Sequence, residues 1–544
     1  MNAAAAPRPQ RVLLVVGALA LAVLFQAGLL FGGWLNHFDW YIHWHYYDWV
    51  RIGLQEHGQL PRFMLDAWHT PNFVANAQSP VLGPLVGLLA FLPTEVYVKG
   101  LVALLTAVGA AGAFALARDL GARPALAACA TVLWTCGGYF AAHVAIGHHW
   151  SLGSYWLPWL FLALRHAAAG SRRAFLAAAA IEAVTLLEGQ HHPFLWQNGL
   201  LGLWALFESI RVRGIAPLAA LASAALAGAL LAGVRLVPVL FEFADYAPEA
   251  RIGGLPPSAL LFSLLSRSQG PATAADFGVL YDHGSGWWEY TFYLGLPGLA
   301  FVAVGVWFAG RRFVPLLLAG AVAAFLSFDT TPFGFDLWAW LQHVPVASSQ
   351  RCPSRLFLLT LFVAIFSATV GWERLLARRA LPARMIAIAF TALAVGMAAD
   401  LVSASRGWQA AAVGPEPQPS RPHRLRPPEL AAPATGTVEE LEISPNRLRY
   451  RVASDRPGFL VFGLRLAGEE QDAWFAEGLP RVATPEGALA VRVPAGSSEV
   501  VMRYRTPGLG AGIALSLASL LALGGLGVRR TPLPWRAPPA QPER

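Results

Sequence analysis

The sequence predicts a mainly α-helical, polytopic membrane protein with a small β domain before its last helix. Of the 544 residues, 56% are hydrophobic and only 13% are charged, whereas about 25% is usual for a soluble domain. Long apolar runs recur along the chain, and short groups of arginines separate them. These observations argue against a soluble enzyme and against a disordered protein. The net charge of +8 lies in the connections, which indicates membrane topology rather than nucleic-acid binding.

The apolar runs predict about twelve transmembrane helices at roughly 20 residues each, and one partial insertion. The run 79–92 is short and contains Pro80, Gly83, Pro84 and Gly87, so we expect it to be re-entrant or interfacial. The predicted spans are residues 12–31, 99–117, 125–142, 151–164, 174–187, 194–210, 215–240, 291–310, 313–328, 356–372, 385–403 and 508–527.

Arginine clusters, such as Arg311 and Arg312, mark alternate connections between these runs. Cytoplasmic loops are enriched in Lys and Arg, so we expect these connections and both ends of the chain to be cytoplasmic. The polar segments that could carry chemistry then gather on the extracytoplasmic side. The sequence has three cysteines and no CxxC pair. Three cysteines are too few for a disulfide framework.

Residues 404–507 differ in composition from the rest of the chain. A Pro- and Arg-rich stretch, 414–434, predicts a linker, and alternating apolar residues after it predict a small antiparallel β domain. The predicted strands are Val438–Ile443, Leu448–Val452, Phe459–Leu464, Ala488–Val493 and Ser498–Tyr504. The expected organisation is a transmembrane domain (1–403), a linker with the β domain (404–507) and a last helix with a cytoplasmic tail (508–544).

Two carboxylates in the first outer loop are candidate catalytic groups. Residues 38–57 predict an interfacial helix, because Trp and Tyr recur along it. Asp39 and Asp48 fall on roughly opposite sides of such a helix, so one site cannot use both. Asp39 is a candidate general base or metal ligand, with capping or solvation of the helix end as the alternative. For Asp48 the alternative is a salt link with Arg51 or His45.

Histidines recur at the outer ends of the predicted helices. His148 and His149 are candidate catalytic residues, and His43, His143 and His192 are candidate substrate ligands. Imidazole transfers protons near neutral pH and binds transition metals, although no zinc signature such as HExxH occurs. The alternative is hydrogen bonding to lipid headgroups or to the backbone.

The segment SSQRCPSRLF places Arg351 and Arg355 four residues apart, and Pro353 predicts that a helix begins there. Two guanidinium groups at a helix N-terminus suit a phosphate. Both arginines lie on the predicted outer side, contrary to the charge rule, which favours a functional role. The alternative is pairing with Asp329 or Asp336.

A further outer segment, YDHGSGWWEYTFYLG, contains Trp288 and Glu289 where the chain enters the membrane. Aromatic rings beside carboxylates are typical of sugar sites, and they are equally typical of any membrane interface. Both residues are candidate substrate ligands.

The order of these segments resembles that of bacterial YfhO-type membrane proteins, which belong with the GT-C glycosyltransferases. The resemblance extends over most of the chain, and each motif is weak alone. The matching segments are GQLP, ANAQSP, IGHHWSLGSYWLPWLFLAL, EGQHHPFLW, WWEYTFYLGLPGLA, RCPSRLFLLTLFVA and the C-terminal β segment ending VPAGSSEVVMRYRTPGLGAGIALS.

The resemblance implies a GT-C-like fold and an inverting enzyme of the bacterial inner membrane. Such an enzyme moves a sugar from a polyprenyl-phosphate donor to an envelope acceptor at the extracytoplasmic face. In this superfamily an acidic residue of the first outer loop acts as base or metal ligand, which by position is Asp39. A divalent metal is thus an open expectation, and no other cofactor is implied. The place of a second polar group is held by His143 and His148 or His149 instead of a carboxylate.

Two other functions compete with this interpretation. The chain could be a non-catalytic membrane protein that binds a glycan or lipid during envelope assembly. It could instead be a transporter or flippase for an envelope lipid, for which midplane charges are expected. Glu182 and Arg235 are the few candidates of that kind.

Overall fold

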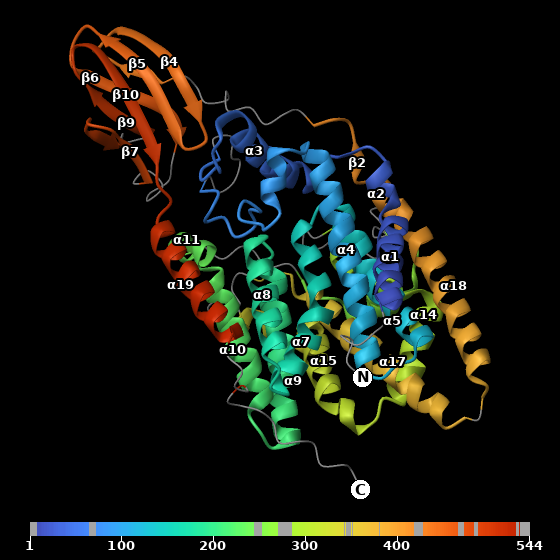
Figure 1. Ribbon diagram of the computed structural model, residues 1–544. Helices are drawn as coiled ribbons and strands as arrows, with labels where there is room; N and C mark the ends of the chain where they lie inside the picture. Colours follow the sequence, from blue (N-terminus) through green and yellow to red (C-terminus); the bar gives the residue numbers. More distant parts are fainter. Residues whose placement is uncertain are drawn as a thin grey trace.

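The computed structural model describes residues 8–64, 72–243, 253–269, 286–341, 343, 350, 352–379, 381–417, 428–465, 473–483, 488–528 and 533. It is mainly helical, with a helical bundle and a β domain placed at one end of it (Figure 1). The first helix, α1, starts at the opposite end of the bundle, and the last helix, α19, also ends there (Figure 1).

A helix, or a closely spaced pair of helices, overlaps each predicted span. They are α1 (Arg8–Phe25) with α2 (Ala27–Phe31), α4 (Thr94–Asp119), α5 (Pro124–Cys136) with α6 (Gly138–Ala145), η3 (His149–Trp156) with α7 (Leu157–Ala168), α8 (Arg172–Leu187), α9 (His191–Val212), α10 (Ala216–Leu231) with α11 (Gly233–Phe243), η6 (Trp287–Tyr290) with α14 (Gly295–Trp307), α15 (Val314–Ser327), η10 (Pro353–Leu356) with α17 (Phe357–Ala377), α18 (Ala383–Ala410) and α19 (Leu509–Val528).

Several of these helices are long and apolar, which indicates a membrane-embedded protein. Within the described residues, 6 helices are long and apolar enough to cross a membrane, or up to 7 if one bent pair forms a single span. The other helices are shorter or less apolar, so the predicted count of about twelve spans is not confirmed.

The predicted span over 215–240 forms a bent pair of helices instead of one straight helix. α10 and α11 meet at an angle of 82°, and α11 packs against α19 instead of continuing α10. Small residues permit this contact, because a Cβ on Gly512 would lie 2.5 Å from the carbonyl oxygen of Gly233. A run of apolar residues does not reveal such a bend.

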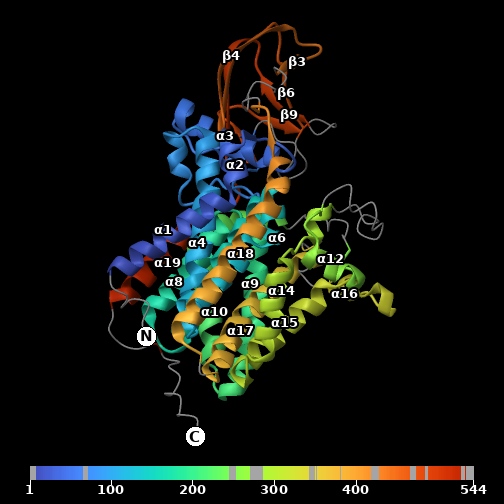
Figure 2. The same ribbon diagram turned by 90° about the vertical axis from the view of Figure 1, so that its right-hand side faces the viewer.

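The segment 79–92 forms turns and one short 3-10 helix, η2 (Val86–Ala90). η2 packs against α3 (Trp40–His57). The prediction of a helix over 38–57 is confirmed, and α3 lies between the bundle and the β domain (Figure 2). A segment of turns at the end of the bundle agrees with the expectation that 79–92 does not cross.

The β domain consists of two four-stranded antiparallel sheets, in the orders β4-β5-β10-β7 and β3-β6-β9-β8. All five predicted strands are present, and three short strands were not predicted. The bounds are β3 (Glu429–Ala431), β4 (Gly436–Ser444), β5 (Arg447–Ser454), β6 (Gly458–Arg465), β7 (Trp474–Ala476), β8 (Arg481–Ala483), β9 (Ala488–Val493) and β10 (Gly496–Tyr504).

The domain boundary differs from the one predicted at residue 404. α18 continues to Ala410, and β2 (Val413–Gly414) pairs with β1 (Trp34–Leu35) beside α2. The first part of 404–507 therefore completes the bundle. Residues 418–427 of the predicted linker lie outside the described part of the chain.

The β domain contacts the first outer loop closely. The ring of Phe63 packs on Trp474 and Tyr504, with centroids 5.2 and 4.7 Å apart. The Asn446 amide accepts a hydrogen bond from the backbone N–H of Arg62 (2.7 Å) and donates one to the Leu60 carbonyl (2.9 Å). These buried contacts fix the domain over the end of the bundle that carries α3.

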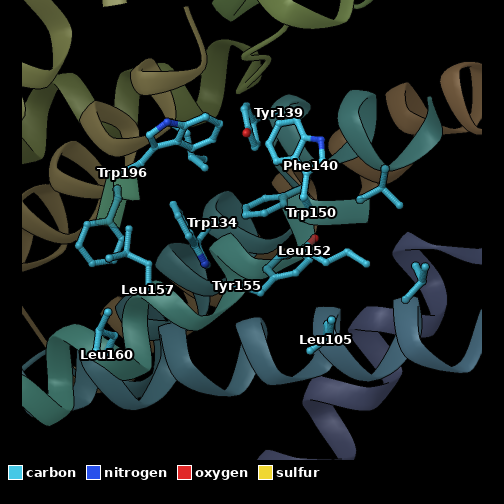
Figure 3. Packing of buried hydrophobic residues seen from close by; sticks show 14 of the residues in the cluster. Leu105, Trp134, Tyr139, Phe140, Trp150, Leu152, Tyr155, Leu157, Leu160 and Trp196 are labelled. Carbon is cyan, nitrogen blue, oxygen red and sulfur yellow. The ribbon is translucent and has the colours of Figure 1, made fainter. Parts of the chain in front are cut away.

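An aromatic cluster fills the bundle below α3. Phe140 of α6 stacks on Tyr155 of η3 at 3.9 Å, and Trp150 contacts Trp196 of α9 at 5.5 Å. Figure 3 shows these rings in one continuous cluster with Tyr139 and Trp134. Close-packed aromatic rings hold three helical segments in fixed positions, and the polar groups of the candidate site lie along this cluster.

Candidate functional site

Asp39 occupies the N-cap position of α3, but its side chain makes no capping hydrogen bond. Asp39 therefore does not cap the helix through its side chain, and solvation of the helix end stays the alternative to a chemical role. Its carboxylate lies 3.2 Å from Nε2 of His148, and 47% of the side chain is exposed. A half-exposed carboxylate with a buried partner can receive a proton from a ligand.

The turn 146–149 brings Asp39 and His148 together. The backbone N–H of Asp39 donates to the carbonyl of Ile146 (3.0 Å). Gly147 has a φ of +88°, and a Cβ there would lie 2.1 Å from the backbone nitrogen of Trp40. Only glycine fits at such a close approach with this backbone conformation. The start of α3 and the turn after α6 are thus held in direct contact.

His148 is linked in turn to His143, with 2.7 Å between their Nδ1 atoms. Both rings are buried, and His143 also packs on Tyr139 at 4.1 Å. Because each ring nitrogen donates or accepts according to its protonation, His143 satisfies Nδ1 of His148 in either state. Asp39, His148 and His143 therefore form a hydrogen-bonded chain from the surface into the bundle.

The electrostatic surroundings keep Asp39 ionised. Burial by itself raises the pKa of this carboxyl, but the hydrogen bond from His148 and the charges of His148 and Arg355 outweigh burial, so the pKa lies below the ordinary value of 3.8. Asp39 is a carboxylate at neutral pH, as a general base must be.

Arg355 forms a buried ion pair with Glu289 on the inner side of the hydrogen-bonded series Asp39–His148–His143. Its Nε and Nη2 donate to the two carboxylate oxygens at 2.7 and 2.5 Å, and the two side chains are 6% and 3% exposed. The guanidinium also lies 4.5 Å from the ring centre of Trp150. The carboxylate partner of Arg355 is thus Glu289, and neither predicted partner, Asp329 nor Asp336, takes that place.

Trp288 lies half-buried next to the open side of the site. Its ring contacts Phe38 edge-to-face at 5.8 Å and His148 at 6.4 Å. Because Phe38 directly precedes Asp39, these contacts place the Trp288 ring along the approach to the carboxylate. An aromatic ring in this position can stack on an apolar face of a sugar.

His43 and His149 form a second buried pair, with ring centres 3.8 Å apart. Burial lowers the pKa of His149 to about 3 and also lowers that of His43, so both rings are neutral. Asp48, by contrast, is bound by Arg51 (2.8 Å) and by the Thr94 hydroxyl (2.8 Å). The structure places Asp48 in the salt link considered above and gives it no contact with Asp39.

His192 lies on the other side of the aromatic cluster. Its Nδ1 and the Nε1 of Trp196 both meet the Gln350 amide oxygen, at 2.9 and 2.8 Å. The Trp150 ring, over which the Arg355 guanidinium lies, contacts the His192 ring at 5.2 Å. Arg351 lies outside the described residues, so the predicted pair of arginines is represented here by Arg355 alone.

The turn after α8 carries a buried carboxyl, Glu188, that was not among the candidates selected from the sequence. Burial raises the pKa of Glu188 to about 7, against a lowering by the charge of Arg235. Arg235 is itself buried and donates to the carbonyls of Asn76, Ser79 and Leu187 at 2.6, 2.6 and 3.2 Å. This arginine ties the first outer loop to the turn at 187–190, which suits a structural role.

Trp150, Gln350 and Glu188 are the members of this region that sequence reasoning missed. Trp150 directly follows the two candidate histidines, and that position was the only signal available. The alternative that the histidines bind headgroups is wrong for His43, His143, His148, His149 and His192, because all five are buried.

A metal ion has no ready set of ligands here. Among the described residues, no three or more His, Cys, Asp or Glu side chains are grouped to hold a metal. Asp39 is bound by one imidazole, and the next acidic group, Glu289, is fully engaged by Arg355. The described residues therefore do not fit the metal-ligand role considered for Asp39.

No known family model and no curated protein matches this chain. The likeness to YfhO-type proteins and to the GT-C superfamily therefore stays a prediction from the motifs. The function must be argued from the site itself.

Proposed function

We propose that the chain is a membrane glycosyltransferase of GT-C type that uses a polyprenyl-phosphate sugar donor and an envelope acceptor. The observation that carries the proposal is the Asp39 carboxylate, which does not cap its helix, is 47% exposed and is held at 3.2 Å by the buried His148. A carboxylate that only solvates a helix end needs no buried imidazole beside it, so the contact with His148 favours a chemical role.

In the proposed reaction, the acceptor hydroxyl attacks the anomeric carbon of the donor sugar. Asp39 takes the hydroxyl proton, the new glycosidic bond forms, and the bond from the anomeric carbon to the phosphate oxygen breaks. The lipid phosphate leaves with the bonding electrons. Because the hydroxyl displaces it directly, the anomeric centre is inverted. Proton transfer to a positioned base typically contributes 10²–10⁴-fold.

The surrounding groups have separate roles in this proposal. His148 fixes the direction of the Asp39 carboxylate, and Trp288 stacks on the sugar. Arg355 acts through its charge, which helps to keep Asp39 ionised, while its Nε and Nη2 bind Glu289. Arg351 keeps its predicted role as a phosphate ligand.

The proposed location is the bacterial inner membrane, with about twelve crossings and the site on the extracytoplasmic side. Asp39 precedes α3, which lies at the same end of the bundle as the β domain (Figure 2). A polyprenyl phosphate has its charged group at the headgroup level, so a base at the end of the bundle is placed where the reacting bond lies.

The test is transfer of labelled sugar from polyprenyl-phosphate donors into envelope fractions of cells with and without the protein. We expect Asp39→Asn to lower transfer by about 10²–10⁴-fold. Asp329→Asn is the matched control, because the Asp329 carboxylate accepts hydrogen bonds from the backbone N–H and the hydroxyl of the nearby Thr331 and its loss should leave transfer unchanged. Full transfer by Asp39→Asn would remove the base assignment, and transfer independent of the protein would remove the enzyme.

A further inference from the structure

A cavity of about 420 Å³ lies where the β domain, the first outer loop and two outer helices meet. One part of its lining is polar and the larger part is apolar. The polar residues are Gln59, Arg62 and Asn446, and the apolar residues are Leu60, Val74, Leu82, Val234, Leu509 and Ile513.

The apolar part of the cavity faces the surrounding bilayer. Leu509 and Ile513 belong to α19, an outer helix of which only 11% of the apolar window is buried. Ile513 is 43% exposed. α19 packs on α11 beside the β domain (Figure 1). A hydrocarbon chain can therefore reach the cavity from the membrane without crossing the protein.

The polar part of the cavity carries the positive charge of Arg62, which has no counterion among the residues that the structure describes. Among the described residues, none forms an ion pair with Arg62, whose backbone N–H is held by Asn446. Burial lowers the pKa of the Arg62 guanidinium; Tyr504 opposes this effect and the charge of Arg505 adds to it. Arg505 lies over the ring of Phe475 at 4.6 Å. A guanidinium in the polar part of a cavity favours an anion beside it.

We propose that this cavity binds an anionic phospholipid of the surrounding bilayer. Its phosphate lies at Arg62 beside Gln59 and Asn446, and one acyl chain follows Val234, Leu509 and Ile513 out to the membrane. Such a lipid bridges α19 and the β domain, because each supplies one part of the lining. The proposal does not depend on the glycosyltransferase assignment, since it concerns another cavity and another ligand.

The experiment uses the full chain in nanodiscs of phosphatidylcholine that contain a small fraction of phosphatidylglycerol with a diazirine in one acyl chain. After illumination, the labelled peptides are identified by mass spectrometry. We expect labels on the segment around Leu509–Ile513 and on the loop around Val74–Leu82. Arg62→Gln should lower this labelling about tenfold, as expected for loss of one hydrogen bond to a charged group.

A second variant, Ile513→Trp, fills the apolar part and should also lower labelling of the Val74–Leu82 segment. The matched control is Arg456→Gln, an exposed arginine paired with Asp455 on the β domain, which should label as the wild type does. Equal labelling by a diazirine phosphatidylcholine would overturn the proposal, as would unchanged labelling in both cavity variants. Displacement by an equimolar polyprenyl phosphate, but not by phosphatidylglycerol, would assign the cavity to a different lipid and contradict it.

Discussion

The Asp39–His148 pair and the Glu289–Arg355 pair each join an acid to a basic side chain in the same region, yet they differ in access. The first pair has one contact of 3.2 Å and a carboxylate that is 47% exposed. The second has two contacts, at 2.7 and 2.5 Å, between side chains that are 3% and 6% exposed. A carboxylate that is buried and bound by a guanidinium through both oxygens is out of reach of a substrate hydroxyl. Access therefore favours Asp39 over Glu289 as the proposed base.

The largest effect that tests this comparison is on stability. Glu289→Gln leaves the buried Arg355 without its counterion, and removing one partner of a buried ion pair typically costs about 3–5 kcal/mol. We expect a correspondingly lower free energy of unfolding in detergent, measured by denaturant titration with tryptophan fluorescence.

The matched control for that variant is Glu439→Gln, which breaks the exposed pair of Glu439 with Arg451 on the β domain. An exposed pair contributes about 1 kcal/mol at most, so this variant should unfold almost as the wild type does. If Glu289→Gln kept its stability and lost transfer instead, Glu289 would be the reacting carboxylate and the comparison would be reversed.

Glu188 extends the comparison of Asp39 with Glu289 to a buried carboxyl that is not bound by a guanidinium through both oxygens. Its pKa is raised to about 7 from the ordinary 4.5, so the folded protein binds this proton more tightly than the unfolded chain does. The free energy of unfolding should then fall as pH rises from 4.5 to 7, by about 3 kcal/mol in all. Glu188→Gln should lose this part of the pH dependence and be the more stable form at pH 8.

The measurement is the thermal midpoint of wild type and Glu188→Gln in detergent at pH 5 and pH 8. Glu499→Gln, an exposed carboxylate on β10 that pairs with Arg449, serves as the control. A wild-type pH dependence that persists in Glu188→Gln would show that Glu188 is ionised in the folded protein.

Much of the fold follows from local patterns in the sequence. Apolar runs predicted where the bundle helices lie, and the alternation of Ala488–Val493 predicted β9 with its observed bounds. The bend between α10 and α11 was not predictable, because it depends on the contact of Gly233 with Gly512 on α19. Hydrophobic periodicity reports what each segment buries, and it carries no information on distant contacts of this kind.

The candidate site was predictable in its members and not in its pairings. Asp39, His148, Glu289 and Arg355 were all selected from the sequence, but the partner of Arg355 is 66 residues away and was not identified. Pairing depends on tertiary packing, here on the turn at Gly147 and the ring of Trp150. Residue type suggests which groups can react, whereas exposure, which separates Asp39 from Glu289, is known only from the fold.

The smallest expected effect concerns His148, which holds the open carboxylate. His148→Gln keeps a donor near Asp39 but removes the imidazole charge, one of the causes that lower the pKa of Asp39. We expect transfer at neutral pH to fall about tenfold, the effect of losing one charge-assisted hydrogen bond. Because Asp39 must be ionised to accept a proton, the acid limb of the pH–rate profile should also move to higher pH. His166→Gln removes an imidazole that pairs with Asp119 and should leave that limb in place. An acid limb unchanged in His148→Gln would mean that His148 only packs against Asp39. The proposal that His148 orients the Asp39 carboxylate would then be wrong.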